Sequence, residues 1–387
     1  MIDIFSDDVR RNPFPMYEAA RATGPVIRVP PPFDAWLFLD YQSVKRALQD
    51  HESFSSAVPA PPHWFIFSDP PLHTKMRGLI SRAFTPGTIS SLEPRIRELS
   101  RRLLDQNLAR GEMDLAADYA VPLPMQVIAE MIGIPPADWL TFRRWSDSIL
   151  KLSYSRGGGP EAQAVRQEFA AVHGEMNEYL AGMISARRAK PADDLLTRLI
   201  QAEVDGEQLT QAEILGFFEL LVVGGQETTA NLINNAILCL LENPGELERL
   251  RANFDLLPSA IEETLRYRAP IQWLMRAPRR DITIAGHTIP AGKLVLAVIG
   301  SANRDGGVFA DADRFDITRN PNPHLSFGHG IHFCIGAPLA RMEAKMALTD
   351  LLTRLRNLRL SSADPWPPRK ALHIHGPSSL PIRFDAA

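Results

Sequence analysis

The chain has 387 residues, and its 45% hydrophobic and 22% charged content is typical of a folded globular protein. Its 42 Lys and Arg residues against 45 Asp and Glu give a net charge of -3, which provides no broad basic surface for nucleic acid. Two cysteines, Cys239 and Cys334, exclude a disulfide framework and a multi-cysteine zinc site, and they indicate a reducing compartment.

The N-terminal residues do not resemble a signal peptide, because Asp3, Asp7 and Asp8 stand where positive charge and an apolar run are needed. The longest apolar stretch, Ile214 to Gly225, is interrupted by Glu219 and is too short to cross a bilayer. We therefore expect a cytoplasmic protein without membrane insertion.

The predicted elements are mostly helices. Proline clusters at 30–32, 59–62 and 365–368 predict rigid loops, and helical spacing of apolar residues covers most of 92–268. Residues 282–289 alternate around Gly286 and predict a β-hairpin, followed by an apolar extended run. The sequence thus predicts a mainly α fold with small β-sheets, organised as a single domain over residues 1–387.

One long central helix is predicted from a capping box at Thr210 and Glu213 to the stop at Asn243-Pro244, about 32 residues or 48 Å. Its middle reads GGQETT at 224–229, which is poor helix-forming material in so apolar a helix. The glycines leave room for a flat group, and Glu227 and Thr228 add an acid and a hydroxyl. Alternatively, the glycines admit a crossing helix and the threonines bond back to carbonyl groups.

The strongest chemical signal is FGHGIHFCIG at 327–336, followed by a predicted helix from 337 to 355. Cys334 comes just before this helix, where backbone N–H groups and the helix dipole favour a thiolate that can bind a metal.

Other interpretations of this loop remain open. A zinc site from His324, His329, His332 and Cys334 lacks the usual paired spacing, and a Cys334–His332 hydrolase lacks an evident orienting partner. A buried structural cysteine is the simplest alternative. A dinucleotide-binding loop is excluded, because Phe333 stands where glycine is required.

The ten residues resemble the haem-thiolate signature of the cytochrome P-450 family, F-G-x-G-x-H-x-C-x-G, at every fixed position. Residues 224–229 resemble the family's oxygen-activating helix, and 263–266 resemble its E-x-x-R motif. Residues 69–86 and 302–316 resemble the bacterial soluble branch. The resemblance covers about residues 69 to 384 and implies a cytochrome P-450 fold with haem between the long helix and the cysteine loop.

This resemblance implies roles for individual residues. Cys334 would be the axial ligand of haem b, and its electron donation would help to cleave the O–O bond. Glu227 and Thr228 would guide protons during O2 activation. Four residues would bind the haem propionates and three would form a structural charge cluster: His73, Arg77, Arg276 and His332 for the first group, and Glu263, Arg266 and Arg314 for the second.

The implied activity is that of a monooxygenase inserting one oxygen atom from O2. The alternative is a haem-binding protein, or a non-oxygenating isomerase or dehydratase on the same scaffold, which would not need Glu227 and Thr228. Because the chain is too short for a fused reductase, electrons would come from a separate ferredoxin or flavodoxin with its reductase. Arg341 and Lys345, on the helix after the cysteine loop, would attract an acidic partner.

The substrate is expected to be a small, neutral, hydrophobic or aromatic molecule, because the implied pocket segments carry apolar residues and a buried ligand charge would need a partner. His63, Ser378 and Ser379 could anchor one polar group, and the prolines at 59–62 would stiffen the entrance loop. The residues expected to line the pocket are Trp64, Phe65, Leu220, Val223, Trp273 and Leu274.

Overall fold

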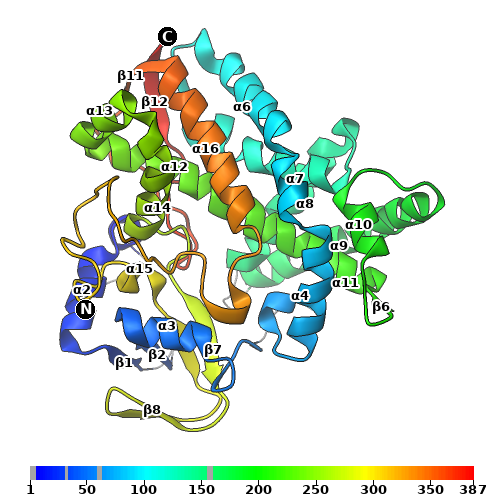
Figure 1. The fold of residues 1–387 in the computed structure, drawn as a ribbon, viewed down its shortest axis with the longest axis horizontal. Coiled ribbons are helices and arrows are strands. Elements are labelled where there is room, and N and C mark those ends of the chain that lie inside the picture. Colours follow the sequence, from blue (N-terminus) through cyan, green and yellow to red (C-terminus); the bar gives the residue numbers. More distant parts are fainter. Residues whose placement is uncertain (1–5, 31–33, 59–62, 155–159) are drawn as a thin grey trace. The chain divides into compact units, whose positions relative to one another are not determined.

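The structure is a computed structural model that describes residues 6–30, 34–58, 63–154 and 160–387 (Figure 1). The run Pro59 to Pro62, expected to stiffen a loop, lies outside the described residues. The chain divides into two compact units. The first comprises Met1–Val58, Ser100–Ala120 and Thr228–Ala387, and the second comprises Pro59–Leu99 and Val121–Glu227.

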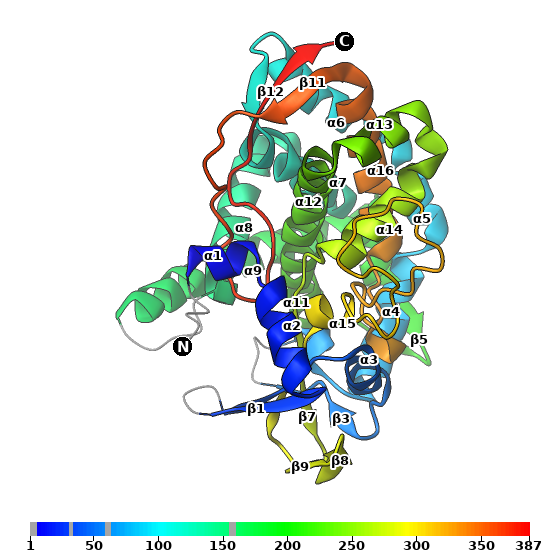
Figure 2. The same cartoon turned by 90° about the vertical axis from the view of Figure 1, so that its left-hand side faces the viewer.

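The first unit contains both helices and sheets. In Figures 1 and 2, α12, α14 and α16 lie side by side, and each contacts the other two. The helices of this unit are α1 (Asp7–Arg11), α2 (Phe14–Thr23), α3 (Tyr41–Gln49), α12 (Thr228–Glu242), α13 (Pro244–Ala252), α14 (Leu257–Tyr267), α15 (Ile299–Ala302) and α16 (Ala337–Arg354).

The largest sheet of this unit has the strand order β1-β2-β10-β7-β3, with β10 parallel to β2 and the other pairs antiparallel. A second sheet has the order β11-β12-β4 (Figure 2). The strands are β1 (Val26–Val29), β2 (Ala35–Phe38), β3 (Phe54–Ser55), β4 (Glu112–Asp114), β7 (Leu274–Pro278), β10 (Leu294–Ala297), β11 (Leu355–Leu360) and β12 (Pro381–Ala386).

The predicted hairpin is confirmed. Strands β8 (Ile282–Ile284) and β9 (His287–Ile289) pair in register, with Ile282 opposite Ile289. Ala285 and Gly286 between them both have positive φ, the backbone that two-residue hairpin turns with the favourable twist require. The alternating isoleucines are buried with the core of the large sheet. This one-sided burial explains why alternation of apolar residues predicted the hairpin.

The second unit is almost wholly helical. Its small hairpin, β5 (Glu203–Val204) with β6 (Glu207–Gln208), packs on α4. Its helices are α4 (Leu72–Ala83), α5 (Pro86–Ser90), the beginning of α6 (Glu93–Leu108), α7 (Pro122–Ile132), α8 (Trp139–Tyr154), α9 (Pro160–Ala189), α10 (Leu195–Gln201) and α11 (Gln211–Leu221).

The predicted long helix is present in three parts. It begins with the predicted capping box, in which the Thr210 hydroxyl accepts from the Glu213 N–H and the Glu213 carboxylate accepts from the Thr210 N–H. After α11 the backbone becomes a π-helical turn, Val222–Glu227, before α12. The helical backbone therefore widens at the residues whose composition is poorest for a regular helix.

No helix in the described part of the chain is long and apolar enough to cross a membrane, in agreement with the sequence. The interrupting acid of the apolar stretch, Glu219, is buried rather than exposed.

Candidate functional site

The cysteine loop is a tight turn that ends at a helix. The Cys334 N–H donates to the Phe327 carbonyl oxygen at 2.8 Å, and Gly328 and Gly330 have φ of 73° and 72°, where glycine is favoured. A Cβ at Gly330 would lie 3.0 Å from the Cα of Gln49, so the loop backbone packs directly on α3. Cys334 is partly buried two residues before Gly336, the N-cap of α16, where the helix dipole favours a thiolate.

Arg341, one of the two predicted docking cations, is already paired. Its guanidinium donates two hydrogen bonds of 2.7 Å to Glu262 and lies 4.4 Å from the ring centroid of Phe327. Burial raises the pKa of Glu262, but the hydrogen bonds from Arg341 and His324 have the larger combined effect and lower this pKa to about 2. The charge of Arg341 is therefore compensated within the protein, which leaves Lys345, exposed on α16, as the better candidate for attracting a partner.

His324, one of the four residues of the zinc interpretation, is bonded within the protein. His324 Nε2 lies 3.1 Å from a Glu262 oxygen, and its Nδ1 accepts from the Ser326 N–H, so both ring nitrogens are engaged. Within the described ranges, no group of three or more His, Cys, Asp and Glu residues could hold a metal ion. Cys334 is the soft ligand that the cysteine loop offers.

The E-x-x-R pair forms the centre of a buried charge cluster. Arg266 donates to both carboxylate oxygens of Glu263 at 2.8 Å, and both side chains are fully buried. Its remaining N–H groups donate to the carbonyl oxygens of Asn303, Ala312 and Arg314. Removing one partner from such a buried pair typically costs about 3–5 kcal/mol, far more than the surface i,i+3 pair that the sequence alone suggests.

The side chain of Arg314 does not join the charge cluster, so the prediction for this residue is wrong. That side chain is 59% exposed and lies 3.5 Å from Asp316, and only the Arg314 carbonyl oxygen reaches the cluster. Arg319 contributes the third charge instead: it is 10% exposed, and its Nε lies 3.1 Å from a Glu263 oxygen. The backbone carbonyl group of Arg314 faces the cluster, so the Arg314 side chain points to solvent. The side chain of Arg319, five residues later, enters the cluster.

The paired glycines of the long helix have different roles. A Cβ at Gly225 would lie 2.6 Å from Ile128 of α7, so this glycine admits a crossing helix, as the structural alternative proposed. A Cβ at Gly224 would have no heavy atom within 4 Å, although most of α11 and α12 is buried. Open space beside the Gly224 backbone is what a flat cofactor would need.

Glu227 and Thr228 follow this open backbone. Glu227 is buried at the end of the π-helical turn, and Thr228 is the first residue of α12 and is partly buried. Gln226, from which the sequence permitted no inference, accepts a hydrogen bond from the Ser146 hydroxyl, and both side chains are buried. Ser146 of α8 thus holds the π-helical turn next to Glu227. Because the two segments are far apart in sequence, no local sequence pattern predicts this contact.

The expected propionate partners belong to both units. In the second unit, His73 is buried on α4 with its ring 5.9 Å from that of Phe65, and Arg77 follows one helical turn later on the same face. In the first unit, Arg276 is buried on β7 and donates to the Met275 carbonyl oxygen, and His332 ends the 3-10 turn Gly330–His332 of the cysteine loop.

Of the expected substrate residues, Trp64, Phe65 and Leu220 are buried in the second unit, and Val223 is partly buried there. Glu219 precedes Leu220 and accepts a hydrogen bond of 2.9 Å from the Trp64 indole N–H. The sequence showed Glu219 only as a break in an apolar run. A carboxyl buried among these apolar side chains is the functional candidate that sequence reasoning missed.

Trp273 and Leu274, the expected substrate residues of the first unit, pack differently. Trp273 contacts the cluster of Phe14 and Tyr17, with its ring 5.4 Å from that of His373. These contacts give Trp273 a packing role, and its place in the substrate pocket stays a prediction. Leu274 packs against the core of the large sheet and is partly buried.

The serines expected to anchor a polar group are bonded within the protein. The Ser379 hydroxyl donates to Asp114 at 2.6 Å, and the Ser378 hydroxyl donates to the Pro367 carbonyl oxygen at 3.1 Å. His63 is the third expected anchor. Its backbone lies against α11 at Gly216.

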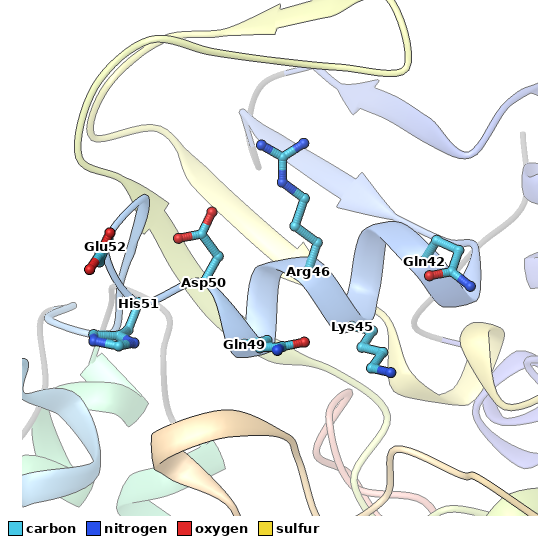
Figure 3. A pocket seen from close by; sticks show the side chains of 7 residues that line it. All are labelled: Gln42, Lys45, Arg46, Gln49, Asp50, His51 and Glu52. Atoms are coloured by element: carbon cyan, nitrogen blue, oxygen red, sulfur yellow. The ribbon is translucent and has the colours of Figure 1, made fainter.

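A surface cavity of about 460 Å³ lies along α3 and the turn after it (Figure 3). Its lining is polar and of mixed charge, and Figure 3 shows Lys45 and Arg46 extending to different sides of the helix. It lacks the apolar walls of a hydrophobic ligand site. The lining residues are Gln42, Lys45, Arg46, Gln49, Asp50, His51 and Glu52.

Comparisons with known proteins agree with this site. The family model described as cytochrome P450 matches residues 160–379. A putative cytochrome P450, YjiB, of Bacillus subtilis (strain 168) is 43% identical over 362 residues, which cover 92% of this chain and 90% of the relative.

Two solved structures give the same result. That of cytochrome P450 CYP109Q5 from Chondromyces apiculatus matches with a TM-score of 0.92 at 38% identity, over 100% of this chain and 98% of that one. The crystal structure of CYP109E1 from Bacillus megaterium in complex with testosterone matches with a TM-score of 0.89 at 39% identity, over 96% and 99%.

The mainly helical fold and the single-thiolate loop define a haem-thiolate protein. With the similarity over nearly the whole chain, it follows that the chain belongs to the cytochrome P450 family. It is a monooxygenase that binds haem b and acts on a hydrophobic small molecule with O2 and electrons from redox partners. The residues present fit the cofactor, because Cys334, at the end of its loop and just before α16, would supply one soft ligand to an iron whose porphyrin supplies others.

Proposed function

We propose that the substrate of this monooxygenase is neutral, compact and largely hydrophobic or aromatic. The observation that carries the proposal is the surroundings of Glu219: Trp64, Phe65 and Leu220 are apolar and buried, and the Glu219 carboxyl accepts a hydrogen bond from the Trp64 indole. An anionic ligand would meet this acid, and the ionisable groups that face it among the described residues are histidines rather than a permanently charged lysine or arginine. The testosterone bound to CYP109E1 is a neutral, hydrophobic molecule, which supports the proposal.

A titration of the ferric protein with two matched probes tests the substrate class. We expect 4-isopropylbenzyl alcohol to produce the shift to high spin that marks substrate entry, and 4-isopropylbenzoate to bind at least about tenfold more weakly, since desolvating an unpaired charge costs more than 1.4 kcal/mol. A high-spin shift confined to the carboxylate would contradict the proposal.

Within this site we assign roles to the protein's own groups. Cys334 holds the haem iron as thiolate, and His73, Arg77, Arg276 and His332 bind the two propionates with charged donors, which buried carboxylates require. Haem, when bound, supplies the iron at which O2 is activated. Glu227 takes up a proton and donates it to the Thr228 hydroxyl, which gives up its own proton in the same step and so relays the proton onward.

We also propose that the electron donor is a separate acidic ferredoxin or a flavodoxin, and that it binds near the cysteine loop. Two lysines of the first unit support this. Lys345 is exposed on α16, and Lys45 lies on α3, against which the loop packs at Gly330. Burial and the nearby charge of Lys45 lower the pKa of His329, which places Lys45 beside the loop.

Charge reversal at both lysines tests the docking surface. We expect Lys45→Glu with Lys345→Glu to raise the apparent KM for an acidic ferredoxin several-fold and to flatten its dependence on salt, because the opposite charge repels the partner. The double reversal Lys190→Glu with Lys370→Glu, at exposed lysines elsewhere, changes the net charge equally and should leave both quantities near the parent values. Equal effects of the two pairs would show a response to net charge alone and would place docking elsewhere.

A further inference from the structure

Glu219 is a buried acid that the proposed roles leave unused. Its side chain is 2% exposed near the C-terminal end of α11, where the sequence places one acid in an otherwise apolar run. Burial raises its pKa to about 7, although the Trp64 hydrogen bond and His63 act in the opposite direction. A carboxyl is seldom kept in such a place unless its hydrogen bonds serve a purpose.

The carboxyl of Glu219 joins three segments of the second unit. Oε2 accepts from the indole of Trp64, which is 7% exposed and stacks on Phe67 just before α4. Oε1 lies 3.4 Å from Nε2 of His173 on α9, a side chain that is 44% exposed. None of the described residues forms a hydrogen bond to Oε1. We call Glu219, Trp64 and His173 the Glu219 junction.

The segment before Trp64 lies directly on the same helix. A Cβ at Gly216, one turn before Glu219, would lie 2.6 Å from the Cβ and 2.7 Å from the carbonyl oxygen of His63. His63 itself has φ of 63°, so its backbone is held in a costly conformation where it crosses α11. The contact at Gly216 and the hydrogen bond at Glu219 therefore hold one short segment at two successive turns.

We propose that Glu219 is a positioning residue: through its hydrogen bond to Trp64 it holds residues 63–68 on α11 and thereby governs substrate binding. The inference rests on the proposed function, which places Trp64 and Leu220 at the substrate. It gives the acid a role in admitting the substrate rather than in the chemical step.

The ionisable groups that face Glu219 among the described residues are His63, from the held segment, and His173, from α9. In the held state a neutral carboxyl can accept from Trp64 through Oε2 and donate its proton from Oε1 toward His173. If residues 63–68 lift away, water reaches Glu219 and its pKa returns toward the ordinary value near 4.3.

The sign of the pH dependence follows from these two states. The held state binds the proton more tightly, so its stability relative to the lifted state is greatest below about pH 4.3 and is lost as pH rises through about 7. Between these two values each pH unit can shift the equilibrium toward the lifted state by up to about tenfold, and above about pH 7, where both states are deprotonated, the shift levels off. We expect the segment to loosen further between pH 6.5 and pH 8.5.

Amide hydrogen exchange of residues 63–68, in the ferric holoenzyme without substrate, tests the junction by itself. We expect exchange in the parent to exceed that in Glu219→Gln at both pH values, and the ratio of the two to rise by about fourfold between pH 6.5 and pH 8.5, because glutamine keeps the acceptor and cannot ionise. Comparison at equal pH cancels the intrinsic exchange rate. Glu178→Gln, an exposed acid on α9, is the matched control and should follow the parent.

Trp64→Phe supplies a second variant that keeps the ring and removes the donor. Since the indole hydrogen bond favours the carboxylate, its loss should raise the pKa of Glu219 further in the held state and move the midpoint of the exchange transition to higher pH. Exchange that is equal in the parent, Glu219→Gln and Trp64→Phe at every pH would overturn the proposal.

The titration with 4-isopropylbenzyl alcohol separates the junction from the substrate site. We expect its affinity to fall by about three- to tenfold in the parent between pH 6.5 and 8.5 and to stay constant in Glu219→Gln. If exchange depends on pH as expected but this affinity does not, residues 63–68 do not govern substrate binding, and the assignment of Trp64 to the pocket is wrong. A shift only with 4-isopropylbenzoate would instead overturn the substrate class and leave the exchange result standing.

Discussion

Replacement of Cys334 by histidine is expected to abolish the strongly red-shifted Soret band that the reduced parent protein shows with carbon monoxide. The band depends on thiolate ligation, and the variant replaces the soft anionic ligand with a neutral imidazole. The loop geometry supports this assignment, because the Cys334 N–H bond to Phe327 and the N-terminus of α16 hold the residue where a thiolate is favoured. The measurement is the spectrum of the reduced, carbon monoxide-treated protein, with haem content determined separately.

Cys239→Ala is the matched control for this variant. Burial raises the pKa of the Cys239 thiol on α12 to about 12, so this cysteine stays protonated and is a poor metal ligand. We expect the control to keep the full band. A band that persists in Cys334→His and disappears in Cys239→Ala would move the ligand to α12.

Thr228→Ala should uncouple electron consumption from product formation. The hydroxyl follows a buried acid at the π-helical turn, and we assign the pair to proton delivery, a contribution that typically amounts to about 10²–10⁴-fold in rate. Without it, the enzyme should continue to consume reductant and release hydrogen peroxide in place of product. The ratio of product to reductant consumed, with peroxide measured in the same samples, gives the coupling.

Thr229→Ala is the control for uncoupling, because it removes the same hydroxyl from the next residue, which faces a different side of the helix. It should keep coupling near that of the parent. Parent-like coupling in Thr228→Ala would leave Glu227 and Thr228 with a structural role.

The features predicted from sequence are those with a local cause. The capping box at Thr210 and the hairpin around Gly286 are set by neighbouring residues, and both are confirmed. The family signature located Cys334 because the loop and the helix after it are contiguous in sequence. The position of the cysteine loop just before a helix was therefore predictable, and ligation by Cys334 stays a prediction.

The features that sequence missed depend on distant contacts. Nothing near Arg319 shows that its side chain, rather than that of Arg314, joins Glu263, because the choice depends on how the segment folds around Arg266. The π-helical turn likewise reflects contacts with α7 and α8, including the one between Ser146 and Gln226. Glu219 looked like a simple break in an apolar run because its partners, Trp64 and His173, lie 155 and 46 positions away along the chain.

The cluster around Arg266 also affects how the protein acquires its cofactor. Every hydrogen bond described for Arg266 ends on the chain itself, at Glu263 or at backbone carbonyl groups between Asn303 and Arg314. The segment leading toward the cysteine loop is therefore ordered by contacts that do not require haem. The conformational entropy of that segment is lost when the polypeptide folds, so haem meets a largely preorganised loop and binds more tightly than it would to a flexible one.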